Sequence, residues 1–263
     1  MARTALVTGA SAGIGWACAQ QLAKEGWEVY AASRRGTAPE GCRGVVMDVD
    51  DDRSVTEGTA EILAGAGTVD AVVTCAGWGL GGAMEDTPLA DARAQMETNF
   101  WGTVRVLQAV LPSMRAAGGG RVVLMSSIGG VIALPFQSFY SASKFALEGL
   151  AESLAYEVAP FGVKVSLVQP GNIKTDFTAR RRTLPGSQAY EGAMSKAISV
   201  MERDERNGAP ASDVAKAVSR LLTSSRPPRR ISVGRAGERV GLVAKRALPF
   251  SLFQAAAKGS LGV

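Results

Sequence analysis

The sequence predicts an α/β protein with one domain, built on a doubly wound parallel sheet that carries helices on both faces. First, apolar runs such as "TALVTG" and "RVVLMSS" do not alternate with polar residues, which is typical of strands buried on both faces. Second, these runs alternate with segments of helical spacing, the βαβ order of a doubly wound fold. Third, no repeat or low-complexity linker divides the 263 residues, so we expect a single domain over residues 1–263.

Each element is assigned from its apolar period and from the residues that begin and end it. The first helix, for example, places Ile14, Cys18 and Leu22 on one face and ends at Gly26. The expected strands are residues 4–9, 27–33, 43–49, 69–77, 121–127, 163–171 and 230–233. The expected helices are residues 13–26, 51–64, 89–100, 102–117, 139–159 and 212–224.

Two segments depart from this alternation. Residues 175–208 are rich in Arg, Ser, Gly and Met, and we expect a mobile insertion near the functional site. Residues 235–263 form a C-terminal extension that ends in the apolar stretch "RALPFSLFQAAAKGSLGV". Packing over the substrate cleft or in an oligomer is the favoured interpretation. Peripheral membrane contact is the alternative, because Phe250 and Phe253 are flanked by lysine and arginine.

The composition excludes several classes of protein. The net charge of +5 is mild and no basic stripe is present, so no nucleic-acid partner is expected. Histidine is absent, which removes Ser-His-Asp and Cys-His mechanisms and nearly all zinc enzymes. The three cysteines are far apart, which favours a reducing compartment. We expect a cytoplasmic protein without a signal peptide or a membrane-spanning helix.

The acidic run "DVDDD", Asp48 to Asp52, has two interpretations. A hard cation would need several converging oxygen ligands. The favoured interpretation is a strand end followed by acidic residues at a helix N-terminus, where the helix dipole stabilises them. No metal site is therefore expected.

Three glycines, Gly9, Gly13 and Gly15, follow the first strand in "TGASAGIG". Glycines there let the backbone turn sharply and approach a pyrophosphate at a helix N-terminus, although a plain tight turn gives the same letters. The pattern also contains the G-x-S-x-G of hydrolases, with Ser11 as nucleophile. That interpretation fails because no histidine can serve as the base. A P-loop is excluded because no G-K-[ST] follows.

The end of the second strand indicates which dinucleotide binds. An acidic residue there would bind the adenosine ribose hydroxyls, but this chain has neutral Ser33 followed by Arg34 and Arg35. Guanidinium groups bind a 2′-phosphate through charge-assisted hydrogen bonds. NADP(H) is therefore favoured over NAD(H). The alternative is that both arginines belong to a solvated loop.

Tyr140 and Lys144 lie four residues apart in "SFYSASKFALEGL", so both lie on one helix face. A free phenol has a pKa of about 10, and a nearby cation lowers that pKa by about 1–3 units. The spacing therefore predicts that an ammonium tunes a phenol for acid–base work. The alternative is an ordinary pair on a helix surface.

Together, "TGASAGIG", Asn99, "SS" at Ser126–Ser127 and Tyr140-x-x-x-Lys144 resemble the short-chain dehydrogenase/reductases, most closely the 17β-hydroxysteroid and retinol dehydrogenase branch. The resemblance implies a Rossmann-like fold and a catalytic group of Asn99, Ser127, Tyr140 and Lys144. It also implies cofactor contacts at Gly9, Ser11, Gly13, Ile14, Gly15, Ser33, Arg34, Arg35, Asp48, Val49, Ala76, Gly77, Tyr140, Lys144, Pro170, Gly171, Ile173 and Thr175.

Within the resemblance, Tyr140 is the acid/base, Ser127 positions the substrate, Lys144 binds the nicotinamide ribose and Asn99 belongs to a proton relay. Two departures stand out. Thr74 and Cys75 replace the asparagines that are common after strand four, so Cys75 is expected to lose a hydrogen bond. Ala12 stands where many NADP-dependent members carry a basic residue.

The implied activity is NADP(H)-dependent hydride transfer to or from a ketone or secondary alcohol. The substrate is expected at residues 77–84, 128–139 and 177–201. Of these, the stretches "WGLGG" and "VIALPF" offer few charges, so a hydrophobic steroid-, retinoid- or lipid-like compound is favoured. The alternatives are a lyase or epimerase on the same scaffold, or a non-catalytic dinucleotide sensor. The resemblance also implies a homodimer or homotetramer.

Overall fold

The computed structural model describes residues 2–261 and contains a seven-stranded parallel sheet. The strand order is β11-β7-β6-β4-β1-β2-β3, and the chain reverses direction across the sheet between β1 and β4, as in a doubly wound fold. The fold class is therefore as predicted. The strands are β1 (Thr4–Thr8), β2 (Glu28–Ser33), β3 (Arg43–Val46), β4 (Ala71–Thr74), β6 (Gly120–Met125), β7 (Val163–Pro170) and β11 (Arg230–Val233).

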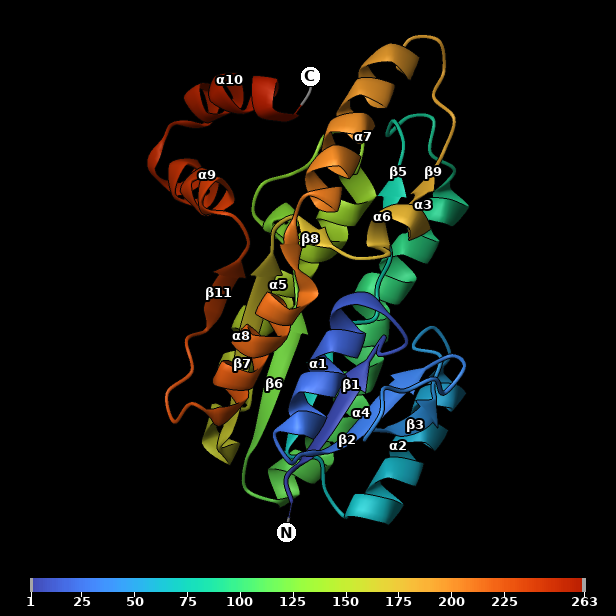
Figure 1. Cartoon of the computed structure of the whole chain (residues 1–263), viewed down its shortest axis with the longest axis vertical. Coiled ribbons are helices and arrows are strands. Elements are labelled where there is room, and N and C mark those ends of the chain that lie inside the picture. Colours follow the sequence, from blue (N-terminus) through green and yellow to red (C-terminus); the bar gives the residue numbers. More distant parts are fainter. Residues whose placement is uncertain (1, 262–263) are drawn as a thin grey trace.

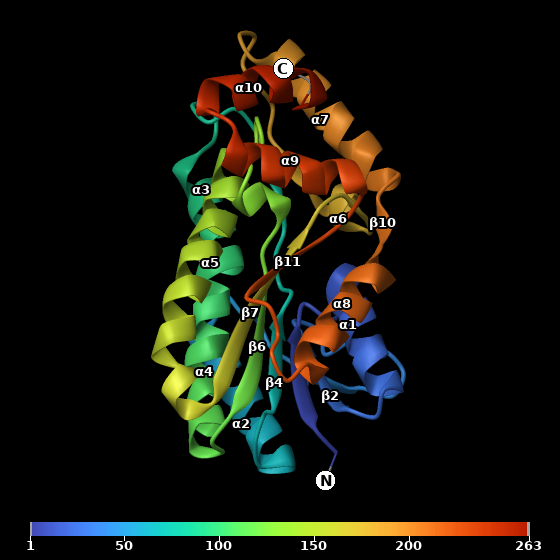
Figure 2. The same ribbon diagram turned by 90° about the vertical axis from the view of Figure 1, so that its left-hand side faces the viewer.

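Helices cover both faces of the sheet (Figures 1 and 2). Successive side chains of a strand point to opposite faces, and in β1 Leu6 joins one apolar core while Ala5 and Val7 join the other. The first core is closed by α2 (Asp52–Ala66), α4 (Gly102–Ala116) and α5 (Ser138–Glu157). The second is closed by α1 (Gly13–Lys24) and α8 (Ala211–Thr223). Because helices cover both faces, the loops that follow the strands gather at the carboxyl edge of the sheet.

The acidic run begins a helix, as expected. The Asp51 carboxylate accepts a hydrogen bond from the backbone N–H of Ser54 at 2.6 Å, which caps α2 and stabilises it by about 1 kcal/mol. The end of α5 is also clearly marked. A 3-10 turn at Ala159–Phe161 and left-handed Gly162 (φ +73°) follow this helix.

The helices expected at residues 89–100 and 102–117 form one continuous rod. α3 (Leu89–Met96) passes through a π-helical turn, Glu97–Trp101, into α4. Such turns insert one extra residue and occur often at functional sites. The turn contains Asn99, so the extra residue lies where the sequence predicts chemistry.

The segment predicted as a mobile insertion, residues 175–208, contains regular secondary structure for much of its length. The segment contains α6 (Phe177–Arg180), β9 (Arg182–Thr183) and the sixteen-residue α7 (Glu191–Arg206). α7 buries Met194, Ala197, Ile198 and Met201, whose spacing is that of an amphipathic helix. Two short sheets tie the segment down, since β9 pairs with β5 (Leu80–Gly81) and β8 (Ile173–Lys174) pairs with β10 (Ala209–Pro210).

The C-terminal extension forms two helices, α9 (Ala236–Ala247) and α10 (Phe250–Leu261). They lie with α7 beyond the carboxyl end of the sheet, away from the N-terminus (Figures 1 and 2). Within residues 2–261, none of the helices combines the length and the apolar character needed to cross a bilayer.

Candidate active site

A cavity of about 1370 Å³ opens at the carboxyl ends of the central strands, where doubly wound proteins bind their ligands. Its wall contains all eighteen predicted cofactor contacts: Gly9, Ser11, Gly13, Ile14, Gly15, Ser33, Arg34, Arg35, Asp48, Val49, Ala76, Gly77, Tyr140, Lys144, Pro170, Gly171, Ile173 and Thr175. The structure therefore brings residues from distant parts of the chain into one space. Their individual roles remain predictions.

The glycine loop has the geometry that a dinucleotide requires. Gly9 adopts φ +64°, and a Cβ there would lie 2.7 Å from the backbone nitrogen of Ala76. A Cβ on Gly15 would likewise meet the Gly9 carbonyl. Ala12 precedes α1 and offers no side-chain cap, so the first N–H groups of α1 remain available to an anion. The residues present thus fit a pyrophosphate.

The adenosine end of the cavity is basic on one side and acidic on the other. Arg34 and Arg35 are exposed and line the cavity, and no ion pair found within residues 2–261 uses either of them. Asp48 and Asp50 line it after β3, and burial raises the pKa of Asp50. Two unpaired guanidinium groups beside neutral Ser33 fit a 2′-phosphate.

Ser127, Tyr140 and Lys144 converge in the middle of the same cavity. All three are buried, with 8%, 8% and 7% of their surface exposed. α5 presents the tyrosine and the lysine on one face, and the Lys144 Nζ lies 5.8 Å from the centroid of the Tyr140 ring. The Ser127 Oγ accepts a hydrogen bond from the backbone N–H of Gly129 at 3.0 Å, which fixes the hydroxyl beside the phenol.

Burial sets the protonation states of this group. It raises the pKa of Tyr140, against the opposing effect of the hydrogen bond with Ser127. It lowers the pKa of Lys144 to about 8, because the ammonium is removed from water. In the protein alone the pKa of Tyr140 is thus raised, against the prediction, and Lys144 is not among the groups that shift it. Tyr140 instead keeps its proton and is poised as an acid.

Lys144 is held by a backbone group rather than by a carboxylate. Its Nζ donates to the Met125 carbonyl at the end of β6 over 2.9 Å. Gly77 leaves the space beside it, since a Cβ there would lie 3.8 Å from that Nζ and 3.0 Å from the Asn99 Oδ1. The absence of a side chain at Gly77 thus lets the loop after β4 approach both the π-helical turn and α5.

Asn99 connects the loop after β4 to α5 from inside the protein. It is fully buried. Its Oδ1 accepts from the Trp78 backbone N–H at 3.0 Å, and its Nδ2 donates to the Trp78 carbonyl and the Ser143 Oγ, each at 3.1 Å. The amide thereby joins the loop after β4 to α5, the helix that carries Tyr140. A part for Asn99 in a proton relay stays a prediction.

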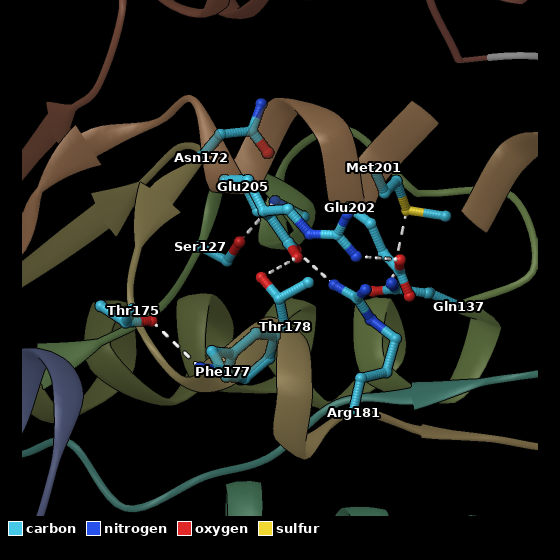
Figure 3. Close-up of polar contacts among 12 residues, drawn as sticks. Ser127, Gln137, Asn172, Thr175, Phe177, Thr178, Arg181, Met201, Glu202 and Glu205 are labelled. Carbon is cyan, nitrogen blue, oxygen red and sulfur yellow. Dashed lines mark hydrogen bonds and ion pairs between the residues drawn. The ribbon is translucent and has the colours of Figure 1, made fainter. Parts of the chain in front are cut away.

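Sequence reasoning missed a charged pair, Arg181 and Glu205, of which Glu205 lines the cavity (Figure 3). The Glu205 carboxylate is ion-paired with Arg181, whose side chain is only 1% exposed, and it accepts a hydrogen bond from the Thr178 Oγ1 at 2.7 Å. Phe177 packs near both the pair and the predicted catalytic tyrosine, with its ring centroid 5.9 Å from that of Tyr140 and 5.8 Å from the Arg181 Cζ. Glu205 adds to the rise in the Tyr140 pKa and Arg181 opposes it. The helical spacing within α7 was the sequence signal for the helix that carries Glu205.

Away from the predicted cofactor contacts, the wall has an apolar part and a charged part that includes Glu205. In the apolar part, Ile132, Leu134 and Met201 come from segments where the substrate was predicted. Leu248 and Phe253 come from the C-terminal extension, so that extension covers the cleft, as favoured among the alternatives. The apolar part suits a hydrophobic ligand.

Cys75, which replaces a common asparagine, interacts inside the protein with buried Cys18, whose pKa it raises through a hydrogen bond. Both thiols are free. The next residue, Ala76, still donates its N–H to the Thr8 Oγ1 at 3.2 Å. The loop after β4 is therefore held to β1 without an asparagine.

Comparison with known proteins assigns the family. The family model for short chain dehydrogenases matches residues 3–185. The chain belongs to this family. It is 40% identical over 253 residues to the 3-ketodihydrosphingosine reductase of Bacteroides thetaiotaomicron, covering 95% of this chain and 94% of that protein. It is 34% identical to retinol dehydrogenase 8 of Bos taurus, covering 87% and 80%, which confirms the predicted similarity to that branch.

Solved structures of the family agree with the fold. A short-chain dehydrogenase from Streptomyces avermitilis superimposes with a TM-score of 0.84 at 31% identity and covers 98% of both chains. ElxO with NADP bound superimposes with a TM-score of 0.73 at 26% identity, covering 89% of this chain and 97% of ElxO. This member of the short-chain dehydrogenases is therefore an oxidoreductase that acts on CH–OH or C=O groups.

Proposed function

We propose that this short-chain dehydrogenase transfers hydride between NADP(H) and a lipid-like ketone or secondary alcohol, with Tyr140 as the general acid and base. The observation that supports it most directly is the meeting of Ser127, Tyr140 and Lys144 in one cavity with the glycine loop. A dinucleotide sensor would have no use for a buried acid beside its ligand. The enzyme is accordingly favoured over the sensor.

Tyr140 supplies the proton for carbonyl reduction. Its raised pKa keeps the phenol protonated at neutral pH, and the Ser127 hydroxyl lies beside it to orient the substrate oxygen. As the carbonyl oxygen gains negative charge, both hydroxyls stabilise it and Tyr140 releases its proton. The bound dinucleotide supplies the hydride. Oxidation of an alcohol uses the same groups in reverse.

NADP(H) is proposed over NAD(H) because Arg34 and Arg35 are free of ion pairs within the described residues and line the cavity. ElxO, a structural relative, has NADP bound. Asp48, Val49 and the first turn of α1 would complete the hold on the dinucleotide. Lys144, with its Nζ directed to the Met125 carbonyl, is placed to contact the ribose.

A lipid-like substrate is proposed from the lining of the cavity beyond the predicted cofactor contacts. Apolar residues of this part of the wall include Ile132, Leu134 and Phe253, which suit a hydrophobic ligand. The name of the Bacteroides relative, 3-ketodihydrosphingosine reductase, specifies a lipid ketone. We therefore propose 3-ketodihydrosphingosine or a similar long-chain ketone ahead of steroids and retinoids.

The test is a panel of 3-ketodihydrosphingosine, a steroid ketone, retinal and a short ketone, each with NADPH and NADH. We expect the fastest turnover with the lipid ketone and NADPH. Tyr140→Phe should lower turnover by roughly 10²–10⁴ with little change in NADPH affinity. Tyr156→Phe is the matched control, because Tyr156 lies on the same helix but is 62% exposed. Near-normal turnover by Tyr140→Phe would refute the assignment, and product without net oxidation of NADPH would indicate a lyase or epimerase.

Two further expectations stay proposals. We propose that residues 1–263 act as one domain. We also propose a homodimer or homotetramer, because family members pair through the helices that correspond to α4 and α5, and Trp101 beside α4 and Phe145 on α5 are 49% and 45% exposed. Sedimentation velocity would test the oligomeric state.

A further inference from the structure

The C-terminal helices have two different faces. On α9, the small residues Gly237, Gly241 and Ala244 form part of the cavity wall. Val240 and Val243 lie on a different face of the same helix and are 65% and 67% exposed. At this point a single helix, α9, separates the cavity from the solvent.

The outer face concentrates the exposed apolar surface of the protein. Twelve large apolar side chains are exposed within the described residues, and five of them lie between positions 240 and 252. We call these five the C-terminal apolar face: Val240, Val243, Leu248, Phe250 and Leu252. Large exposed apolar patches mark sites of contact with another protein or with a membrane.

The charges around this face are positive. Arg239 and Arg246 are seven residues apart and exposed, so they form a row along α9 beside the two valines. Lys245 lies 4.4 Å from the centroid of the Phe250 ring. The acidic residue of this segment, Glu238, is turned inward, where its Oε1 accepts hydrogen bonds from the backbone and the side chain of Asn172 at 2.9 and 2.7 Å.

We infer that the C-terminal apolar face docks on the surface of a lipid bilayer that contains anionic lipids. Apolar side chains that enter the headgroup boundary, with a row of basic residues beside them, are the pattern of a helix that lies in the interface. A symmetric contact with a second copy is disfavoured, because it would bring the arginine rows of both copies together. The helices of residues 2–261 are too short or too polar to span a bilayer, so the contact is peripheral.

The position of this face has a consequence for catalysis that rests on the proposed function. The docked helices are also the cavity wall. Buried Phe253 lines the cavity, and Leu248, which is 42% exposed, belongs both to the lining and to the C-terminal apolar face. A lipid ketone would then reach Tyr140 from the bilayer by a path that avoids bulk water. Docking itself does not depend on this, because it follows from the outer face alone.

The test is co-sedimentation of the full chain with phosphatidylcholine vesicles, with and without phosphatidylglycerol. We expect binding to the anionic vesicles that weakens as salt is added. Val243→Asp combined with Leu252→Asp should weaken it at least about tenfold, and Arg239→Gln with Arg246→Gln roughly fivefold for each charge. Phe161→Asp, on an exposed residue at the far end of α5, is the control and should bind as the parent does. Reduction of a short soluble ketone should be equal in all variants.

Equal binding to neutral and anionic vesicles, or unchanged binding by Val243→Asp with Leu252→Asp, would overturn the inference. A third outcome would also overturn it: the parent binds no vesicles and forms a dimer in sedimentation velocity, and Val243→Asp with Leu252→Asp loses that dimer. Vesicle binding without turnover of any lipid ketone would leave the docking surface in place and remove the proposed substrate.

Discussion

The buried ammonium of Lys144 should make the protein less stable at neutral pH than a variant without that charge. Burial lowers its pKa from 10.5 to about 8, so the charged form is disfavoured in the folded state. At about 1.4 kcal/mol per pH unit, the charge costs the fold about 3 kcal/mol wherever both states are protonated. Lys144→Met removes this cost. It also leaves the Met125 carbonyl without its donor, a loss of about 1–3 kcal/mol.

The pH dependence separates these two contributions. The charge cost is complete below about pH 8, where folded and unfolded chains are both protonated, and it fades as pH rises toward 10.5, since the folded chain loses its proton first. The lost hydrogen bond does not titrate in this way. We therefore expect the difference in unfolding free energy between Lys144→Met and the parent to shift against the variant by about 2 kcal/mol between about pH 7 and about pH 10.

Urea unfolding of both proteins at the two pH values gives this difference directly. Lys258→Met is the matched control, because Lys258 is exposed and its removal should produce no such shift. A difference between Lys144→Met and the parent that is the same at both pH values would refute the argument from burial. Lys144→Met should also lose turnover, which would show that the site retains a charge that the fold does not favour.

Three more outcomes can be measured. Arg34→Gln with Arg35→Gln should raise the Kd for NADPH by roughly 10–100-fold for each lost charged hydrogen bond and leave that for NADH nearly unchanged; equal effects on both would exclude contact with a 2′-phosphate. Gly9→Ala should destabilise the fold by about 1–3 kcal/mol and weaken dinucleotide binding, since its Cβ would lie 2.7 Å from the Ala76 nitrogen; thermal unfolding without loss of stability would count against this. Because burial raises the pKa of Tyr140, the kcat/KM for reduction should stay level through neutral pH and fall only at alkaline pH; a fall near neutrality would contradict a protonated phenol in the free enzyme.

The sequence was sufficient for the central sheet because its strands are continuous apolar runs with clear ends. β11 has the bounds that were predicted, Arg230–Val233. The predicted cofactor contacts all reach one cavity, because parallel strands deliver their following loops to the same edge of the sheet. The order of elements therefore carried most of the information about the site.

The misses have physical causes. α7 has helical spacing, but the richness of residues 175–208 in Arg, Ser, Gly and Met favoured an irregular interpretation. The π-helical turn around Asn99 has no sequence signal, since it depends on how α3 and α4 pack. The direction of the Tyr140 pKa depends on the depth of burial, which α6, α7 and the C-terminal helices decide together.

The π-helical turn has a consequence for any attempt to transplant or shorten this region. The turn absorbs one surplus residue, so α4 keeps the orientation that a regular helix would have with one residue fewer. Deleting one residue from Glu97–Trp101 would therefore restore a regular helix and leave Val106, Val110 and Met114, now fully buried on α4, in the interior. The deletion would remove the bulge that carries the Asn99 amide, so the aim of that amide can be altered without turning the helix that follows.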